Sequence, residues 1–130
     1  MVKNLVLRSK FMLLSEIKSI LGAEVLSGEN MDDLEKKEIH TACGCDLMSD
    51  VLAFVKDQSL LLTGLINSQV IRTAEMMDIA AVCFVRGKTP PEDVIKLAKE
   101  KGITVLTTAH PLYTACGKLY HEGLRGRGND

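Results

Sequence analysis

The chain has 130 residues, of which 46% are hydrophobic, 25% are charged and 4% are aromatic, with a formal net charge of -1. This length is enough for one domain with its own core, and the composition is typical of a globular protein. A near-neutral charge and so few rings argue against nucleic-acid binding, which requires a basic surface or rings for base stacking. No apolar run approaches the length of a membrane span, so we expect neither nucleic-acid nor membrane partners.

The first part of the chain is expected to contain an extension, a helix and a strand. Residues 1–11 mix basic and apolar side chains and form an expected N-terminal extension, either an added strand or a segment ahead of the domain. From Leu13 onward, apolar residues recur at helical spacing, and Gly22 stands where a C-terminal cap belongs, so a short helix is predicted. Residues 23–28 are a predicted strand and turn.

A charged segment, a strand and a second helix follow. Residues 29–38 alternate in charge without an apolar face and are expected to be a solvated loop. A strand is predicted over 39–45. Ser49 is then suited to cap a helix that runs to residue 54 or 55.

Three short apolar runs dominate the second half of the chain. They span residues 59–64, 80–87 and 103–108, and each passes into a small or polar group and then a helix-like segment. This alternation is typical of parallel strands joined by crossover helices. Right-handed crossovers would place those helices on the faces of the sheet. We therefore predict an α/β fold, a three-layer sandwich with a mainly parallel sheet.

Capping signals mark the three helices that accompany these runs. Asn67 or Ser68 is suited to cap the first, Pro91 to begin the second, and Gly123 to follow the last. The Gly-rich, polar residues 125–130 are expected to be a flexible tail.

Three segments resemble the DRTGG domain, which is related to the N-terminal domain of HPr kinase/phosphorylase. They are GCDLMSDVLAFV (44–55), LLLTGLINSQVIRTAEMMDI (60–79) and the closing TACGKLY (114–120), and the resemblance also extends to FVRG (84–87) followed by EDVIKLAKEKGITVL (92–106). The resemblance covers roughly residues 12–124, which we expect to be a single domain. It implies a regulatory or ligand-binding domain that is commonly dimeric. A further similarity is to short, stand-alone bacterial proteins, some of which are encoded near iron-hydrogenase subunits.

The chain departs from the family pattern at two places. Residues 65–67 follow Thr63 and Gly64 where the family often has an acidic-basic pair, and residues 85–87 read Val-Arg-Gly where many members have Thr-Gly-Gly. No GxxxxGK[ST] phosphate-binding loop occurs, so the resemblance does not carry kinase activity to this chain.

Polar residues at the ends of the three apolar runs form the main candidate site. Parallel strands deliver such groups to one edge of a sheet, where open α/β folds bind ligands, and amides at helix starts can hold an anion. The alternative is that these residues only form turns and caps. The candidates are Thr63, Gly64, Asn67, Gln69, Arg86, Gly87, Lys88, Thr107, Thr108 and His110.

Cysteine residues suggest a second, different kind of site. Cys43 and Cys45 are one residue apart on one face of a predicted strand, so they are candidates for metal binding or a redox pair, with Cys116 as a further ligand. The same spacing also suits two small packed side chains. Cys83 lies in an apolar run and is expected to be buried. Free thiols without a secretory signal favour the cytoplasm.

Other polar groups admit both functional and structural interpretations. Asp46 and Asp50 are suited to bind a cation or a ligand, or to cap helices. His110 beside Tyr113 suits acid-base chemistry, but no nucleophile or partner carboxylate accompanies the pair, so an exposed junction is the simpler interpretation.

The sequence also predicts self-association. An apolar strip of Met76, Met77, Leu119 and Tyr120 is expected to remain uncovered and to form a homodimer contact. The predicted function is a non-catalytic regulatory domain, without a cofactor, that binds a small anionic or nucleotide-like ligand or a protein partner. The alternative is a thiol- or metal-dependent accessory protein of a redox system, working through Cys43 and Cys45.

Overall fold

The computed structural model describes residues 11–54 and 58–126. Apart from residues 11, 125 and 126, the expected N-terminal extension and flexible tail lie outside the described residues. Within the described part of the chain, no helix combines the length and apolar content needed to cross a membrane.

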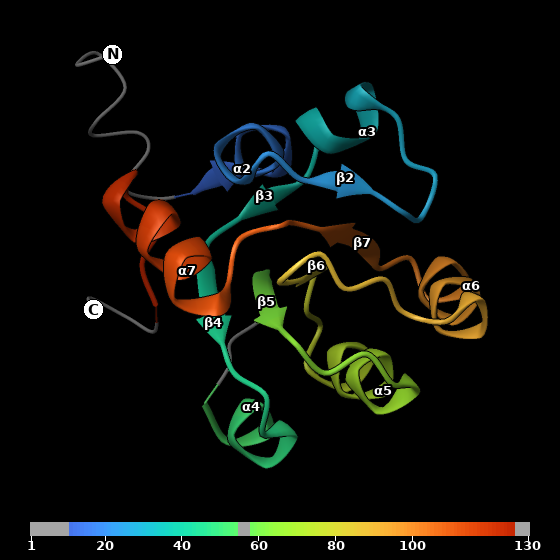
Figure 1. The fold of residues 1–130 in the computed structure, drawn as a ribbon. Coiled ribbons are helices and arrows are strands. Elements are labelled where there is room, and N and C mark those ends of the chain that lie inside the picture. The colour runs from blue at the N-terminus through green and yellow to red at the C-terminus, as the bar shows by residue number, and fades with distance from the viewer. Residues whose placement is uncertain (1–10, 55–57, 127–130) are drawn as a thin grey trace.

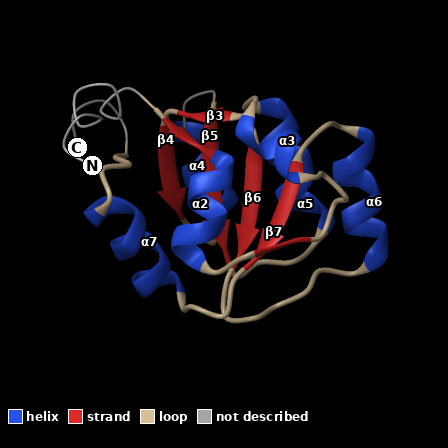
Figure 2. Cartoon of the chain, turned by 90° about the horizontal axis from the view of Figure 1, so that it is seen from above, coloured by secondary structure: helices blue, strands red, loops and turns tan. Residues whose placement is uncertain are grey.

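A five-stranded sheet forms the centre of the molecule (Figure 1). Its order is β2-β7-β6-β5-β4, and the four strands from β4 to β7 are parallel. Figure 2 shows them pointing the same way. Only β2 is antiparallel, at the outer side of β7. The bounds are β2 Glu24–Val25, β4 Thr41–Gly44, β5 Ser59–Thr63, β6 Ala81–Phe84 and β7 Thr104–Thr107.

Three helices cover one face of this sheet: α4 Met48–Phe54, α5 Ser68–Met76 and α6 Glu92–Glu100. Each lies between two neighbouring parallel strands, so connections of one hand bring all three to the same side. Their apolar residues, among them Val51 and Ala98, pack in one core cluster with Leu61 and Phe84 of the strands.

The opposite face is covered by α2 Leu14–Leu21 and α7 Leu112–His121, with α3 Met31–Glu35 against α2. A separate two-stranded sheet of β1 Met12–Leu13 and β3 Glu38–Ile39 adds to this layer.

Strand alternation divides the core between the two faces. Leu60 and Leu62 pack with α2 and α7, whereas Leu61 between them packs with α4 and α5. All three are fully buried. A strand that is apolar at every position suits a sheet with helices on both faces, and the predicted three-layer, mainly parallel fold is confirmed.

Three local predictions were wrong. The single strand predicted over 39–45 is two strands, because β3 ends at Ile39 in the two-stranded sheet and β4 begins at Thr41 in the five-stranded one. The expected loop over 29–38 contains α3, because Asn30 and Asp33 form a reciprocal capping box and Leu34 is buried. Ser49 does not cap α4, since the helix already begins at Met48 and the Leu47 carbonyl accepts its first hydrogen bonds.

Candidate functional site

The carboxyl ends of β4 and β5 are joined through one carboxylate. Asp46 follows β4, and its Oδ1 accepts a hydrogen bond from Thr63 Oγ1 at 2.8 Å and another from the Gly64 N–H at 2.8 Å. Thr63 is fully buried, and its hydroxyl oxygen also accepts from the Leu65 N–H at 3.1 Å. Asp46 itself is exposed, so its second oxygen faces the strand edge open to solvent.

These contacts favour the ionised form of Asp46. The hydrogen bond from the Gly64 amide, followed by that from the Thr63 hydroxyl, lowers the pKa of the carboxyl group, and the charges of Lys88 and Arg86 lower it further. The carboxylate is therefore a fixed negative charge at neutral pH, placed beside two cations.

Lys88 ties the ends of β5, β6 and β7 together. Its Nζ donates to the Gly64 carbonyl oxygen at 2.9 Å, and its own carbonyl accepts from Thr107 Oγ1 at 2.7 Å. Among the described residues, one of the three ammonium N–H groups thus has a protein acceptor, and the other two are available for a ligand or water.

Arg86 occupies a strained turn immediately after β6. Its φ is 59° and that of Gly87 is 67°, and the Lys88 N–H closes the turn on the Val85 carbonyl at 3.2 Å. This geometry is that of a type I′ turn, in which glycine is favoured and arginine is unusual. No described residue bonds the guanidinium, which is exposed.

The same turn is held by the connection from β7 to α7. The Arg86 N–H donates to the His110 carbonyl at 2.8 Å, and the Gly87 N–H donates to the Thr108 carbonyl at 2.7 Å. Thr108 is buried, and its hydroxyl donates to the Leu21 carbonyl at 2.7 Å. These two amides are therefore occupied by protein carbonyls, so at this turn the side chains of Arg86 and Lys88 are the groups left to bind an anion.

Asn67 and Gln69 have a local role. Asn67 Oδ1 accepts from the Gln69 N–H at 3.1 Å, which makes Asn67 the predicted N-cap of α5. No hydrogen bond between described residues links either one to Arg86 or Lys88.

The structure thus brings together eight of the ten predicted residues through a chain of contacts at one edge, and leaves Asn67 and Gln69 as a separate pair. Sequence reasoning had assigned Asp46 to a different motif. The feature that could have placed Asp46 at this site is the parallel register of β4 on β5. In this register Gly44 pairs with Leu62, so residue 46 lies level with Gly64.

Cysteines lie on both faces of the sheet. Cys43 and Cys45 pack on the α4 side, as the alternation predicted, whereas Cys116 of α7 packs on the other. Burial, with smaller contributions from neighbouring thiols and Asp50, raises the pKa of Cys43 to about 11. Among the described residues, no group of three or more His, Cys, Asp or Glu side chains is placed to hold a metal. Cys83 is buried, as predicted.

The predicted apolar strip is not continuous. Leu119 is 1% exposed and belongs to the core, whereas Met76 is 72% and Tyr120 is 52% exposed. Met76 and Tyr120 lie on helices that cover opposite faces of the sheet. The prediction failed for Leu119 because that side of α7 is turned to the sheet.

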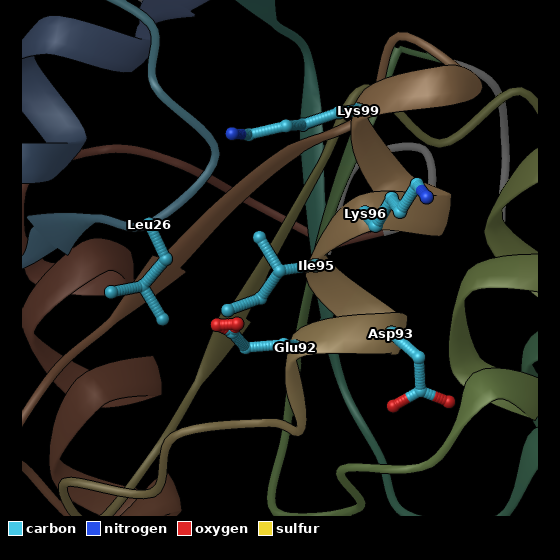
Figure 3. A pocket seen from close by; sticks show the side chains of 6 residues that line it. All are labelled: Leu26, Glu92, Asp93, Ile95, Lys96 and Lys99. Carbon is cyan, nitrogen blue, oxygen red and sulfur yellow. The ribbon is translucent and has the colours of Figure 1, made fainter.

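Hollows lined by described residues also occur away from the strand ends. One of about 410 Å³ lies between α6 and the end of β2, where Leu26, Ile95 and Glu92 face each other across it (Figure 3). Asp93 and Lys96 point away from it in the same view. Another, of about 710 Å³, is an open depression along α7 beside Tyr113 and Tyr120.

The architecture is that of an open α/β domain with polar groups gathered at one strand edge. A family model described as the DRTGG domain matches residues 16–121, and the chain belongs to this family. No match was found among curated proteins.

A solved structure with a similar fold contains the CBS and DRTGG domains of the regulatory region of Clostridium perfringens pyrophosphatase, complexed with its activator, diadenosine tetraphosphate. The TM-score is 0.66 at 21% sequence identity, and the match covers 82% of this chain. This chain spans 45% of that one, and the likeness establishes the fold.

Proposed function

We propose that this chain is a non-catalytic regulatory domain that binds a small anionic or nucleotide-like ligand at the carboxyl ends of its parallel strands. The observation that carries the proposal is the pairing of Arg86 and Lys88 at that edge. The Arg86 side chain is exposed and bonded by no described residue, while its backbone is held in a left-handed turn. Such strain at a non-glycine residue is characteristic of functional positions.

The family and its solved relative support a regulatory role. In that relative the DRTGG domain belongs to a regulatory region. The hydroxyls of Thr63, Thr107 and Thr108 are each engaged with a protein acceptor here, which suits a rigid binding edge better than a reacting centre.

A thermal-shift screen of the full chain against nucleotides and phosphorylated metabolites tests the proposal. We expect one ligand class to raise Tm by several degrees at about a hundredfold excess over Kd. Arg86→Ala should abolish the shift, whereas Arg72→Ala, at an exposed arginine of α5, should leave it unchanged. Equal loss in both variants, or no shift with any ligand, would contradict the proposal. Ligand recovered unaltered after prolonged incubation would support the absence of catalysis.

We also propose that the domain forms a homodimer through the exposed face of α7. Tyr113 is 90% and Tyr120 is 52% exposed, and both border the depression on this helix. The Arg125 guanidinium lies 3.9 Å from the Tyr120 ring centroid and orders part of this surface. Light scattering on the eluting protein should give twice the chain mass. Tyr113→Ser should shift it towards the monomer, and Met76→Ser, on the opposite layer, should not.

A further inference from the structure

Gly64 separates two opposite charges at the strand edge. A Cβ at this position would stand 3.6 Å from Lys88 Nζ and 3.7 Å from Asp46 Oδ2. Both charged groups therefore flank the small space that the missing side chain of Gly64 leaves open. Gly64 is not among the residues with positive φ, so its backbone conformation does not require glycine.

The two charges act on each other without forming an ion pair. Lys88 lowers the pKa of Asp46 through its charge, yet the side-chain ion pairs between described residues are Lys101–Glu75 and His40–Glu38. Each group is instead anchored on Gly64, Asp46 by the amide and Lys88 by the carbonyl. These two hydrogen bonds to Gly64 place the second carboxylate oxygen of Asp46 and the ammonium group of Lys88 on either side of the space above Gly64.

The chemistry of the two groups restricts what fits between them. A phosphate or carboxylate oxygen would accept from Lys88 but be repelled by Asp46, and an amine would suit Asp46 but be repelled by Lys88 and Arg86. A hydroxyl both donates and accepts, so it satisfies the two groups at once.

We propose that a hydroxyl group of the ligand bridges Asp46 and Lys88 above Gly64, so that the bound molecule is a phosphorylated polyol, such as a sugar phosphate or the ribose of a nucleotide. This inference rests on the ligand site proposed above. It assigns the anionic group of the ligand to Arg86 and its hydroxyl to the Asp46–Lys88 pair.

Matched probes separate the two parts of the site. The full chain is titrated with ribose 5-phosphate, AMP, 2′,3′-dideoxy-AMP and inorganic phosphate, and binding is measured by calorimetry and thermal shift. AMP should bind at least about tenfold to a hundredfold more tightly than its dideoxy form, because the loss of even one of the two hydrogen bonds to charged groups has this effect. If ribose 5-phosphate binds and AMP does not, the ligand is a sugar phosphate. If AMP binds and ribose 5-phosphate does not, the site also recognises a base.

Two variants test the bridging position. Gly64→Ala places a methyl at ordinary contact distance from both groups, so the fold should persist while the advantage of AMP over dideoxy-AMP disappears. Asp46→Asn keeps an oxygen for the Gly64 and Thr63 donors but replaces the charged acceptor Oδ2 with an amide NH2, so it should reduce the advantage of AMP over dideoxy-AMP without abolishing it. Adding Arg86→Ala to either variant should still weaken the binding of dideoxy-AMP.

The outcomes distinguish this inference from the function on which it rests. Equal binding of AMP and dideoxy-AMP, with both lost in Arg86→Ala, would overturn the hydroxyl bridge and leave the anion site standing. A hydroxyl preference that survives Gly64→Ala would also overturn the bridge. Failure of every phosphorylated probe to bind would overturn both.

Discussion

At the amino edge of the parallel strands, the ammonium group of Lys37 donates to the carbonyls of Ala80 and Gly102 at 3.2 Å and to the Thr104 hydroxyl at 2.7 Å. At the carboxyl edge, the ammonium group of Lys88 donates to one protein acceptor, the Gly64 carbonyl. Lys37 thus uses all three of its donors within the protein, whereas Lys88 retains two.

The carboxylates at the two edges differ in which of their oxygens accept hydrogen bonds from the protein. Glu29 at the amino edge receives the Ser27 hydroxyl on one oxygen and the Thr104 hydroxyl on the other. Asp46 at the carboxyl edge receives both of its donors on Oδ1. Both oxygens of Glu29 are thus engaged, whereas Oδ2 of Asp46 accepts from no described residue and remains open to a ligand.

The largest expected effect is the difference in stability between alanine substitutions at two glycines. The space beside Gly44 is occupied by another side chain, whereas the space beside Gly64 is open. A Cβ on Gly44 would overlap the sulfur of Cys116, whereas one on Gly64 makes ordinary contacts. Gly44→Ala should therefore lower the free energy of unfolding by about 2 kcal/mol through overpacking, and Gly64→Ala by much less. Urea unfolding measures both. Adding Cys116→Ala should restore part of the stability to Gly44→Ala, and an unchanged loss would show that the overlap is not its cause.

An effect of similar size is expected at Lys37 and a smaller one at Lys88. Lys37→Met leaves the Gly102 carbonyl without this donor and Glu29 without its nearby positive charge, so we expect a loss of about 2 kcal/mol in unfolding free energy. Lys88→Met should cost less than about 1 kcal/mol, because its ammonium group makes a single contact at a half-buried position. Similar losses for the two variants would remove the distinction between the edges.

Asp46 should give a small, pH-dependent contribution to stability. Its folded pKa is lowered, so the stabilisation is present above its unfolded pKa of about 3.9 and is lost as pH falls through the lower folded value. Because the carboxylate is exposed, we expect less than about 1 kcal/mol. The difference in unfolding free energy between the wild type and Asp46→Asn should be constant near neutral pH and shrink below pH ~4. A difference that persists in acid would assign the effect to packing.

The smallest effect is expected in the reactivity of the thiols, which should differ between the folded and the unfolded chain. Burial raises the pKa of Cys43 to about 11 and that of Cys83 to about 12. At pH 8 the native protein should therefore react with iodoacetamide more slowly than the urea-unfolded chain, roughly a hundredfold at Cys43 and roughly a thousandfold at Cys83. Mass spectrometry of the alkylated peptides measures both rates. Rapid alkylation of native Cys43 would revive the thiol-dependent alternative.

The sequence was sufficient for the three long parallel strands and most of the helices, but not for β1 or for the division of residues 38–44 between β3 and β4. Strands β5, β6 and β7 are continuous apolar runs, and such runs indicate burial on both faces wherever they occur. Helix α3 was missed because it is held by a local capping box and one buried residue, Leu34, rather than by an apolar face. Short helices of this kind have little periodicity to detect.

The candidate site was predictable only in part. The side chains of Lys88 and Thr107 were placed at the right edge because strand ends can be located from the apolar runs. The role of Asp46 depends on which strand β4 pairs with, and pairing is a long-range property. The amides of Arg86 and Gly87 are consumed by backbone carbonyls, and backbone partners leave no trace in side-chain identity.

Both outer strands of the sheet are short or covered. β2 has two residues, and on the far side the Ala42 N–H of β4 donates to the Arg125 carbonyl at 2.9 Å. A sheet with such edges offers little backbone for another chain to extend, which protects it from strand-by-strand aggregation. A second copy of the sheet would therefore find few unpaired strand groups to extend, so contacts with other molecules fall to the helices and the strand ends.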